Sequence, residues 1–114
     1  MTTLYGIKNC DSVKKAKKWL EQENITYQFH DFRSDGFNAE LLAELLTYTD
    51  LTALLNKRST TFRNLADDVK NNLTDEVITE NILAQPTLIK RPLLKHKQAL
   101  LVGFKESQYQ QALI

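Results

Sequence analysis

Cys10, the single cysteine of the chain, is the residue with the clearest chemical potential. It lies between a short apolar stretch that ends at Gly6 and a lysine-rich segment with helical spacing. A lone cysteine is by default a small buried apolar side chain. At a helix N-terminus, however, free backbone N–H groups and the positive end of the helix dipole favour the thiolate, which is the nucleophilic form. The sequence around Cys10 therefore leaves two interpretations, a packed thiol and a nucleophile.

The charged neighbours of Cys10 act in both directions. Lys8 and Lys14 favour a thiolate at position 10, whereas the adjacent Asp11 opposes it. The lysines of this segment also invite a nucleic-acid interpretation, and they are Lys14, Lys15, Lys17 and Lys18. At about 100° per residue these lysines share the outward side of a helix, so a solvated face explains them better than nucleic acid does. Only Lys14, one helical turn from Cys10, is expected near the site.

The elements that must position Cys10 follow from periodicity. Residues 3–5 are typical of a short strand, and a helix is expected from Asp11, its candidate N-cap. The inward-facing positions of that helix are Val13, Ala16 and Leu20. Alternating apolar residues over 25–29 then predict a second strand, and the crossover is long enough for the two strands to be parallel.

The rest of the chain divides into a helical segment and a second mixed segment. Helical spacing over residues 38–83 predicts three or four short helices, one of them beginning at Thr74. Strands are expected at 87–89, 93–95 and 99–102, with a turn at 96–98, followed by a helix over about 105–113. That last helix should bury Tyr109, Ala112 and Leu113. The fold class is therefore α/β: a thioredoxin-like fold with a helical insertion, over about residues 38–84, between a βαβ half and a ββα half.

Composition limits the remaining possibilities. The 114 residues, 42% of them hydrophobic, predict a single domain spanning residues 1–114. Fifteen basic and fourteen acidic side chains leave a net charge of +1, which offers no overall field for nucleic acid or for an anionic membrane. One cysteine makes no internal disulfide, and we see no signal peptide, so a reduced, cytoplasmic protein is expected. His30 and His96 lack partners at ligand spacing, so neither a metal site nor a bound cofactor is expected.

Several segments together resemble the arsenate reductase (ArsC)/Spx family, and in particular its YffB-like branch. They are Tyr5-Gly6-Ile7-Lys8-Asn9-Cys10-Asp11-Ser12, Leu54-Leu55-Asn56-Lys57-Arg58, Ile89-Lys90-Arg91-Pro92-Leu93-Leu94 and Gly103-Phe104. The resemblance implies a thioredoxin-like fold with a helical insert and a reactive Cys10 at the start of the first helix. It also implies a cis bond between Arg91 and Pro92, facing Cys10. Without the resemblance we would expect that bond to be trans, because only about 5–6% of X–Pro bonds in folded proteins are cis.

The chain also departs from its relatives. Arsenate reductases of this family hold their oxyanion with three arginines, and the corresponding positions here are Asn56, Arg91 and Gly103. Regulators of the Spx type often carry Cys-x-x-Cys, whereas Val13 stands at the second cysteine position here. Arsenate reduction is therefore disfavoured, and an internal disulfide switch is excluded because the chain has no second cysteine.

Our leading hypothesis is a small cytoplasmic thiol oxidoreductase that depends on glutathione and forms a mixed disulfide on Cys10. Cys10 and Arg91 are the expected catalytic residues, and the expected substrate-binding residues are Lys8, Asn9, Lys14, Asn56, Arg58 and Pro92. Asn56, Lys57 and Arg58 have an equally good alternative role as the polar end of a helix. The expected partners are glutathione or another thiol or disulfide substrate, with glutaredoxin as a further candidate. The alternative hypothesis is a non-catalytic regulator that docks on the α subunit of RNA polymerase, and a true arsenate reductase ranks third.

Overall fold

The computed structural model describes residues 2–114, which form two compact units. One unit comprises residues 2–36 and 91–114, and the other comprises residues 37–90. Each unit is described separately below. The prediction of a single domain over residues 1–114 stays a prediction.

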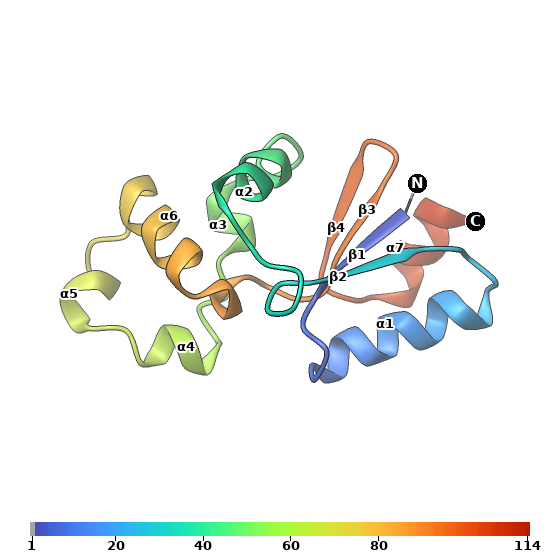
Figure 1. Ribbon diagram of the computed structural model, residues 1–114, viewed down its shortest axis with the longest axis horizontal. Coiled ribbons are helices and arrows are strands. Elements are labelled where there is room, and N and C mark those ends of the chain that lie inside the picture. The colour runs from blue at the N-terminus through green and yellow to red at the C-terminus, as the bar shows by residue number, and fades with distance from the viewer. Residues whose placement is uncertain (1) are drawn as a thin grey trace. The chain divides into compact units, whose positions relative to one another are not determined.

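The first unit is built on one four-stranded sheet (Figure 1). Its elements are β1 (Thr2–Gly6), α1 (Asp11–Gln22), β2 (Gln28–Asp31), β3 (Leu93–His96), β4 (Ala99–Val102) and α7 (Glu106–Leu113). The strand order is β2-β1-β3-β4, with β1 parallel to β2 and antiparallel to β3, and β3 antiparallel to β4. This order confirms the predicted βαβ and ββα halves of a thioredoxin-like fold.

The helices α1 and α7 pack against the same face of the sheet. The buried cluster that joins them contains Leu4, Val13, Ala16, Trp19, Leu20, Leu94 and Tyr109. Tyr109 is completely buried, and its ring meets Trp19 edge to face at 5.7 Å and Phe104 at 4.9 Å between ring centroids. Ala112 and Leu113, which were predicted to be buried, are only half-buried.

Strand β2 begins later than predicted because the preceding residues end α1. Asn24 adopts a positive φ of 57°, its N–H donates to the Glu21 carbonyl, and the Ile25 N–H donates to the Leu20 carbonyl at 2.9 Å. This is the Schellman arrangement that terminates many helices. Ile25 packs against the core from that position, and ladder pairing with β1 begins only at Gln28.

Gly6 allows β1 and α1 to approach closely. A Cβ at position 6 would lie 2.6 Å from Cγ2 of Val13, in the first turn of α1. Only glycine avoids this clash, so the end of β1 holds the start of α1, and with it Cys10, against the sheet.

The second unit is helical, as predicted for the insertion. It contains α2 (Ala39–Leu45), α3 (Leu51–Leu54), α4 (Thr60–Arg63), α5 (Asp67–Lys70), α6 (Asp75–Ala84) and the 3-10 helix η1 (Pro86–Leu88). These five α-helices exceed the three or four that were predicted. Side-chain oxygens of Asn38, Asp50, Ser59 and Thr74 accept N–H groups at four of the helix starts. The prediction that a helix begins at Thr74 is confirmed.

The predicted strand at 87–89 is wrong. Pro86 begins a short 3-10 turn, because proline suits the first turn of a helix and cannot donate to a sheet ladder. Ile89 makes one isolated antiparallel bridge to Leu55. The Asn56 N–H donates to the Leu88 carbonyl and the Lys90 N–H donates to the Leu54 carbonyl, both at 2.8 Å.

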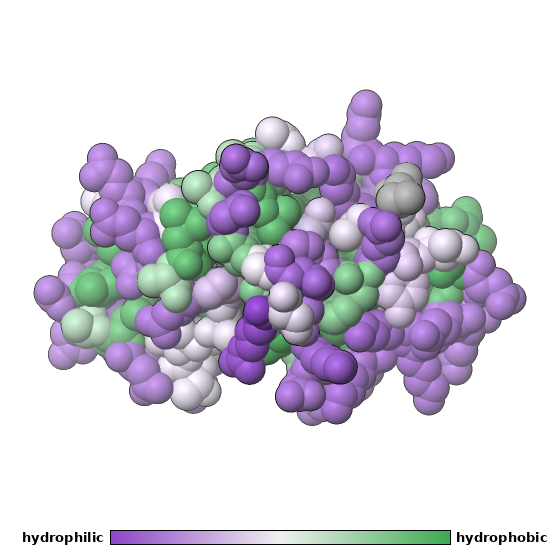
Figure 2. All heavy atoms as spheres, viewed as in Figure 1, coloured by the Kyte–Doolittle hydropathy of each residue, from purple (hydrophilic) through white to green (hydrophobic). Residues whose placement is uncertain are grey.

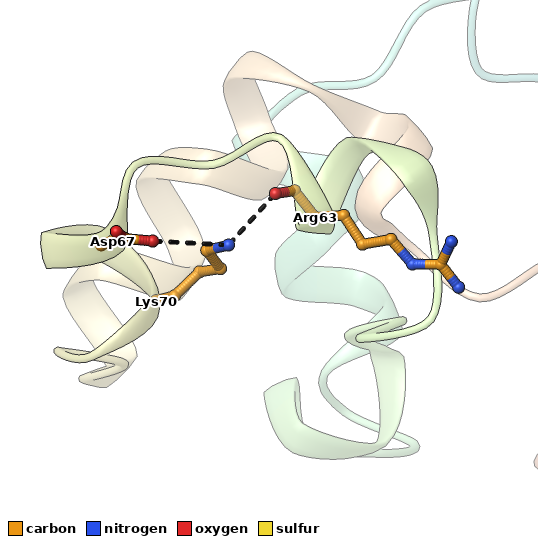
Figure 3. A network of polar contacts seen from close by, with 3 residues as sticks. All are labelled: Arg63, Asp67 and Lys70. Carbon is orange, nitrogen blue, oxygen red and sulfur yellow. Dashed lines mark hydrogen bonds and ion pairs between the residues drawn. The ribbon is translucent and has the colours of Figure 1, made fainter.

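Lys70 ties α4 to α5 within the second unit (Figure 3). Its ammonium group donates to the Arg63 carbonyl at 3.1 Å and lies 3.7 Å from an Asp67 carboxylate oxygen. The Arg63 guanidinium points away from both of these groups in Figure 3. None of the helices within residues 2–114 combines the length and the apolar character needed to cross a membrane.

Candidate active site

Cys10 is the N-cap residue of α1. Its backbone is extended (φ −95°, ψ 126°), and its carbonyl accepts the first helical N–H, that of Lys14, at 3.0 Å. The N–H groups of residues 11–13 precede this first helical bond, so they and the helix dipole are available to an anion at the cap. The predicted N-cap, Asp11, is instead the first helical residue, because the chain is still extended at Cys10.

The Cys10 side chain combines the two predicted environments. It is half-buried and packs against the core cluster shared by α1 and α7. No side-chain capping hydrogen bond involves it. Cys10 is therefore packed against the core on one side, and the residue as a whole remains partly exposed.

Lys8 and Asn9 form an exposed turn between β1 and Cys10. Asp31, the last residue of β2, holds this turn from the neighbouring strand, where it pairs with Gly6. One oxygen of its carboxylate accepts the Lys8 N–H at 3.0 Å. The other accepts the N–H groups of Arg33 at 2.7 Å and Ser34 at 3.2 Å. Asp31 is only 5% exposed.

Three backbone donors determine the charge state of Asp31. Burial raises the pKa of its carboxyl, but the N–H donors of Arg33, Ser34 and Lys8, together with the Arg33 charge, lower it further than burial raises it. The net result is a pKa below the ordinary value of 3.8. Asp31 was missed in the sequence, where the only available signal was a carboxylate that ends an alternating apolar strand.

Arg91 and Pro92 lie at the end of the sheet from which Cys10 departs. Tyr5 pairs with Leu93 in the antiparallel β1–β3 ladder, so Pro92, one residue earlier, comes beside the C-terminal end of β1. The Arg91–Pro92 peptide bond is cis, as the family resemblance implied. Pro92 is buried and Arg91 is half-buried.

Gly103 lies beside Pro92, because its N–H donates to the Pro92 carbonyl at 2.8 Å. Its φ is +80°, and a Cβ at this position would meet no atom within 4 Å. The space beside residue 103, where the family resemblance implies an arginine in arsenate reductases, is therefore open here. No side chain at this position contributes a cation to this end of the sheet.

The lysine-rich face of α1 is mostly solvated, as predicted, and the surface over α1 is hydrophilic in Figure 2. Lys14, Lys15 and Lys18 are exposed. Lys17 differs, because it is half-buried and its ammonium lies 3.6 Å from the centroid of the Phe29 ring. The description of Lys17 as a purely solvated residue is therefore wrong, since it braces α1 against β2 through a cation–π contact.

Asn56 and Arg58 belong to the second unit, where they line a cavity of about 420 Å³. The other lining residues are Thr52, Leu55, Lys57 and Lys90. The side-chain oxygen of Asn56 accepts the Arg58 N–H at 3.0 Å, which shapes the loop that follows α3. Lys90 was not among the predicted ligand-binding residues. Within residues 2–114, no group of three or more His, Cys, Asp or Glu side chains is placed to hold a metal ion.

Comparison with known proteins relates both units to one family. Residues 5–112 match the ArsC family. The chain is 30% identical over 110 residues to the global transcriptional regulator Spx of Streptococcus agalactiae. The aligned residues make up 95% of this chain and 80% of the regulator. The solved structure of a protein described as YFFB covers all of both chains, with a TM-score of 0.92 and 40% identity. That of an arsenate reductase-related protein from Brucella melitensis has a TM-score of 0.80 and 46% identity, covering 96% and 92% of the two chains.

Proposed function

The chain belongs to the ArsC family, and we propose that it is a small cytoplasmic thiol oxidoreductase with Cys10 as nucleophile and glutathione as co-substrate. The observation that carries this proposal is the position of Cys10 as N-cap of α1, half-buried, at the end of the sheet that also carries Arg91 and Pro92. Family membership with arsenate reductase-related proteins supports thiol chemistry at this cysteine.

The reaction consists of two thiol–disulfide exchanges. The Cys10 thiolate attacks the glutathione sulfur of a mixed disulfide R–S–S–G, forming Cys10–S–S–G and releasing R–S⁻. A second glutathione thiolate then attacks the glutathione sulfur bound to Cys10. Glutathione disulfide leaves, and the Cys10 thiolate is restored. The net reaction converts R–S–S–G and one glutathione thiol into R–SH and glutathione disulfide, so the thiol of the second glutathione is oxidised and the sulfur of R is reduced.

The neighbouring groups have distinct proposed roles. The N–H groups at the start of α1 and the Lys14 charge stabilise the thiolate. Arg91 pairs with a carboxylate of the substrate, and the backbone beside Pro92 presents polar groups to an extended thiol peptide. Lys8 and Asn9 form the exposed turn that directly precedes Cys10 and are the proposed outer contacts of the substrate.

Arsenate is a poor candidate substrate. A cysteine–arsenate adduct carries several negative charges, and each hydrogen bond to a charged group contributes about 1.5–3 kcal/mol. With Asn56 and Gly103 at two of the three arginine positions, the loss corresponds to at least about a hundredfold, because 1.36 kcal/mol equals a factor of ten. We expect negligible arsenite production in an assay with glutathione and glutaredoxin.

Intact-mass measurement after incubation with glutathione disulfide tests the proposed chemistry. The wild type should gain one glutathionyl group and lose it again when glutathione is added, whereas Cys10→Ser should gain none. A wild type that stays unmodified until it is unfolded would mean that Cys10 is a packed structural thiol. Equal modification of both proteins is not expected, because Cys10 is the only thiol in the chain.

A second candidate function is regulation of transcription. It is favoured by the match to the Spx regulator over 95% of the chain, and in this case the protein would dock on the α subunit of RNA polymerase. Binding of purified α subunit by both wild type and Cys10→Ser, without any thiol transfer by the wild type, would favour this function. Thiol transfer without α-subunit binding would favour the first.

A further inference from the structure

The cavity that Asn56 and Arg58 line in the second unit concentrates positive charge. Three of its six lining residues, Lys57, Arg58 and Lys90, are cationic, and none is acidic. Within residues 2–114, no carboxylate forms an ion pair with any of these three side chains. By contrast, Lys70 of the same unit has Asp67 beside it (Figure 3). Three like charges around one hollow repel each other, so an anion that enters it relieves the repulsion.

The loop that carries these charges is fixed by its backbone. The Asn56 N–H donates to the Leu88 carbonyl, and the Lys90 N–H donates to the Leu54 carbonyl, so residues 56 and 90 are held on adjacent segments. The Asn56 carbonyl accepts both the N–H and the hydroxyl of Ser59. The Arg58 N–H is bonded to the Asn56 side chain. The cationic side chains therefore project from a prearranged frame.

These backbone bonds also indicate the class of anion. The N–H groups of Asn56, Arg58, Ser59 and Lys90 already have acceptors. They are not available to form the nest of backbone amides that commonly cradles a phosphate. Recognition must come from side chains, and the planar Arg58 guanidinium matches a carboxylate with two parallel hydrogen bonds.

The size and lining of the cavity add a second requirement. Its volume of about 420 Å³ is that of a small-molecule pocket and exceeds the needs of one inorganic anion. Leu55 and Thr52 also line the cavity, and these residue types add an apolar side chain and a hydroxyl to its charged groups. Because the cations come from two separate segments, at residues 57–58 and at residue 90, they suit two carboxylates joined by a short aliphatic or peptide body.

We propose that this cavity is a binding site for a small organic dicarboxylate, with Arg58 and Lys90 contacting the two acidic groups. The inference rests on the proposed function only for the choice of ligand, since glutathione is a peptide with two carboxylates. It does not depend on any reaction at Cys10, because the cations, the frame and the cavity all belong to the second unit.

The test is a calorimetric titration of full-length Cys10→Ser with S-methylglutathione, which has both carboxylates and no reactive thiol. We expect saturable 1:1 binding that weakens as salt is added. Arg58→Gln and Lys90→Gln, each added to Cys10→Ser, should weaken binding by about tenfold to a hundredfold, the equivalent of one lost charge-assisted contact. Arg63→Gln is the matched control, because Arg63 is an exposed arginine of the same unit that does not line the cavity.

Two further probes examine the ligand class. Glutarate should compete with S-methylglutathione, whereas inorganic phosphate at the same ionic strength should not. Circular dichroism of each variant checks that it is folded, which the exposed or half-buried positions of Arg58 and Lys90 favour. The inference is overturned if S-methylglutathione does not bind, if Arg58→Gln and Lys90→Gln bind like Arg63→Gln, or if phosphate competes as well as glutarate.

The outcome is separable from that of the proposed function. Thiol transfer by the wild type without dicarboxylate binding would reject the cavity site alone. Binding in the Cys10→Ser protein, with no thiol transfer by the wild type, would reject the oxidoreductase alone.

Discussion

Replacing Asp31 by asparagine should destabilise the turn that carries Cys10 and the whole first unit. The Asp31 carboxylate accepts the N–H groups of Lys8, Arg33 and Ser34 at 3.0, 2.7 and 3.2 Å. An asparagine oxygen can keep Arg33 and Ser34 as donors, but its NH₂ group then faces the Lys8 N–H and accepts nothing. Losing one hydrogen bond to a charged group lowers the free energy of unfolding by about 1.5–3 kcal/mol. Replacing the charged acceptor of the other two hydrogen bonds by a neutral one lowers it by roughly 0.5–1 kcal/mol for each bond.

The sum is a decrease of about 2.5–5 kcal/mol in the free energy of unfolding at pH 7, a large fraction of the 5–15 kcal/mol typical of a domain. Urea denaturation followed by circular dichroism measures it. Asp11→Asn is the matched control, because it removes the same charge from an exposed residue next to Cys10. Amide exchange should be faster at Lys8, Arg33 and Ser34 in Asp31→Asn and unchanged there in Asp11→Asn.

The effect of Asp31→Asn should also depend on pH. The folded-state pKa of Asp31 lies below its ordinary value of 3.8, so the unfolded chain binds the proton more readily. The contribution of Asp31 is complete above about pH 5 and is lost as the pH falls through the lowered pKa. The stability difference between wild type and Asp31→Asn should therefore shrink between pH 5 and pH 2. A difference below about 1 kcal/mol at pH 7, or one that stays constant down to pH 2, would refute this reasoning.

Three further substitutions test other contacts in the first unit. Gly6→Ala should lower the free energy of unfolding by about 1–3 kcal/mol in a urea titration, because the added Cβ would lie 2.6 Å from the Val13 side chain. An unchanged free energy of unfolding would mean that α1 shifts freely. Tyr109→Phe should be neutral or slightly stabilising in thermal denaturation, because the buried Tyr109 hydroxyl has no hydrogen-bond partner within residues 2–114. Burial raises the pKa of this phenol, so wild type should lose stability above about pH 10 and Tyr109→Phe should lose less. Lys14→Ala should slow the alkylation of Cys10 at pH 7. Lys17→Ala should leave that rate nearly unchanged and lower the stability of the fold, because Lys17 contacts the Phe29 ring. Equal slowing in both variants would mean that the whole basic face of α1 acts on Cys10.

Much of the local structure was predictable because it depends on neighbours in the sequence. The inward positions of α1 repeat with helical spacing, and Thr74 precedes an acidic first turn that it caps. The helical insertion was predicted from the same periodicity. The errors are also local: Pro86 starts a 3-10 turn where a strand was expected, and Asn24 ends α1 in a way that delays β2.

The candidate site was predictable only in part. The Cys10 and Arg91–Pro92 segments were identified by their resemblance to a family, and strand pairing then places them at one end of the sheet. Asp31 was not predicted, because its carboxylate reaches the Lys8 N–H across 23 positions of sequence. No periodicity indicates such a contact, since it depends on the register that sets Gly6 beside Asp31.

The sequence alone determined the chemical inventory: one thiol, no second cysteine to resolve it, and one arginine at the three positions where the family resemblance implies an oxyanion site. These are statements about side-chain identity, and folding does not alter them. Only the tertiary structure decided which charges act together. It places the Lys17 ammonium over the Phe29 ring, and it buries Asp31 where three backbone N–H groups donate to its carboxylate. It also brings Lys90 together with Lys57 and Arg58 around one cavity. Charge interactions decay with distance through space rather than along the chain, so their partners are known only once the chain is folded.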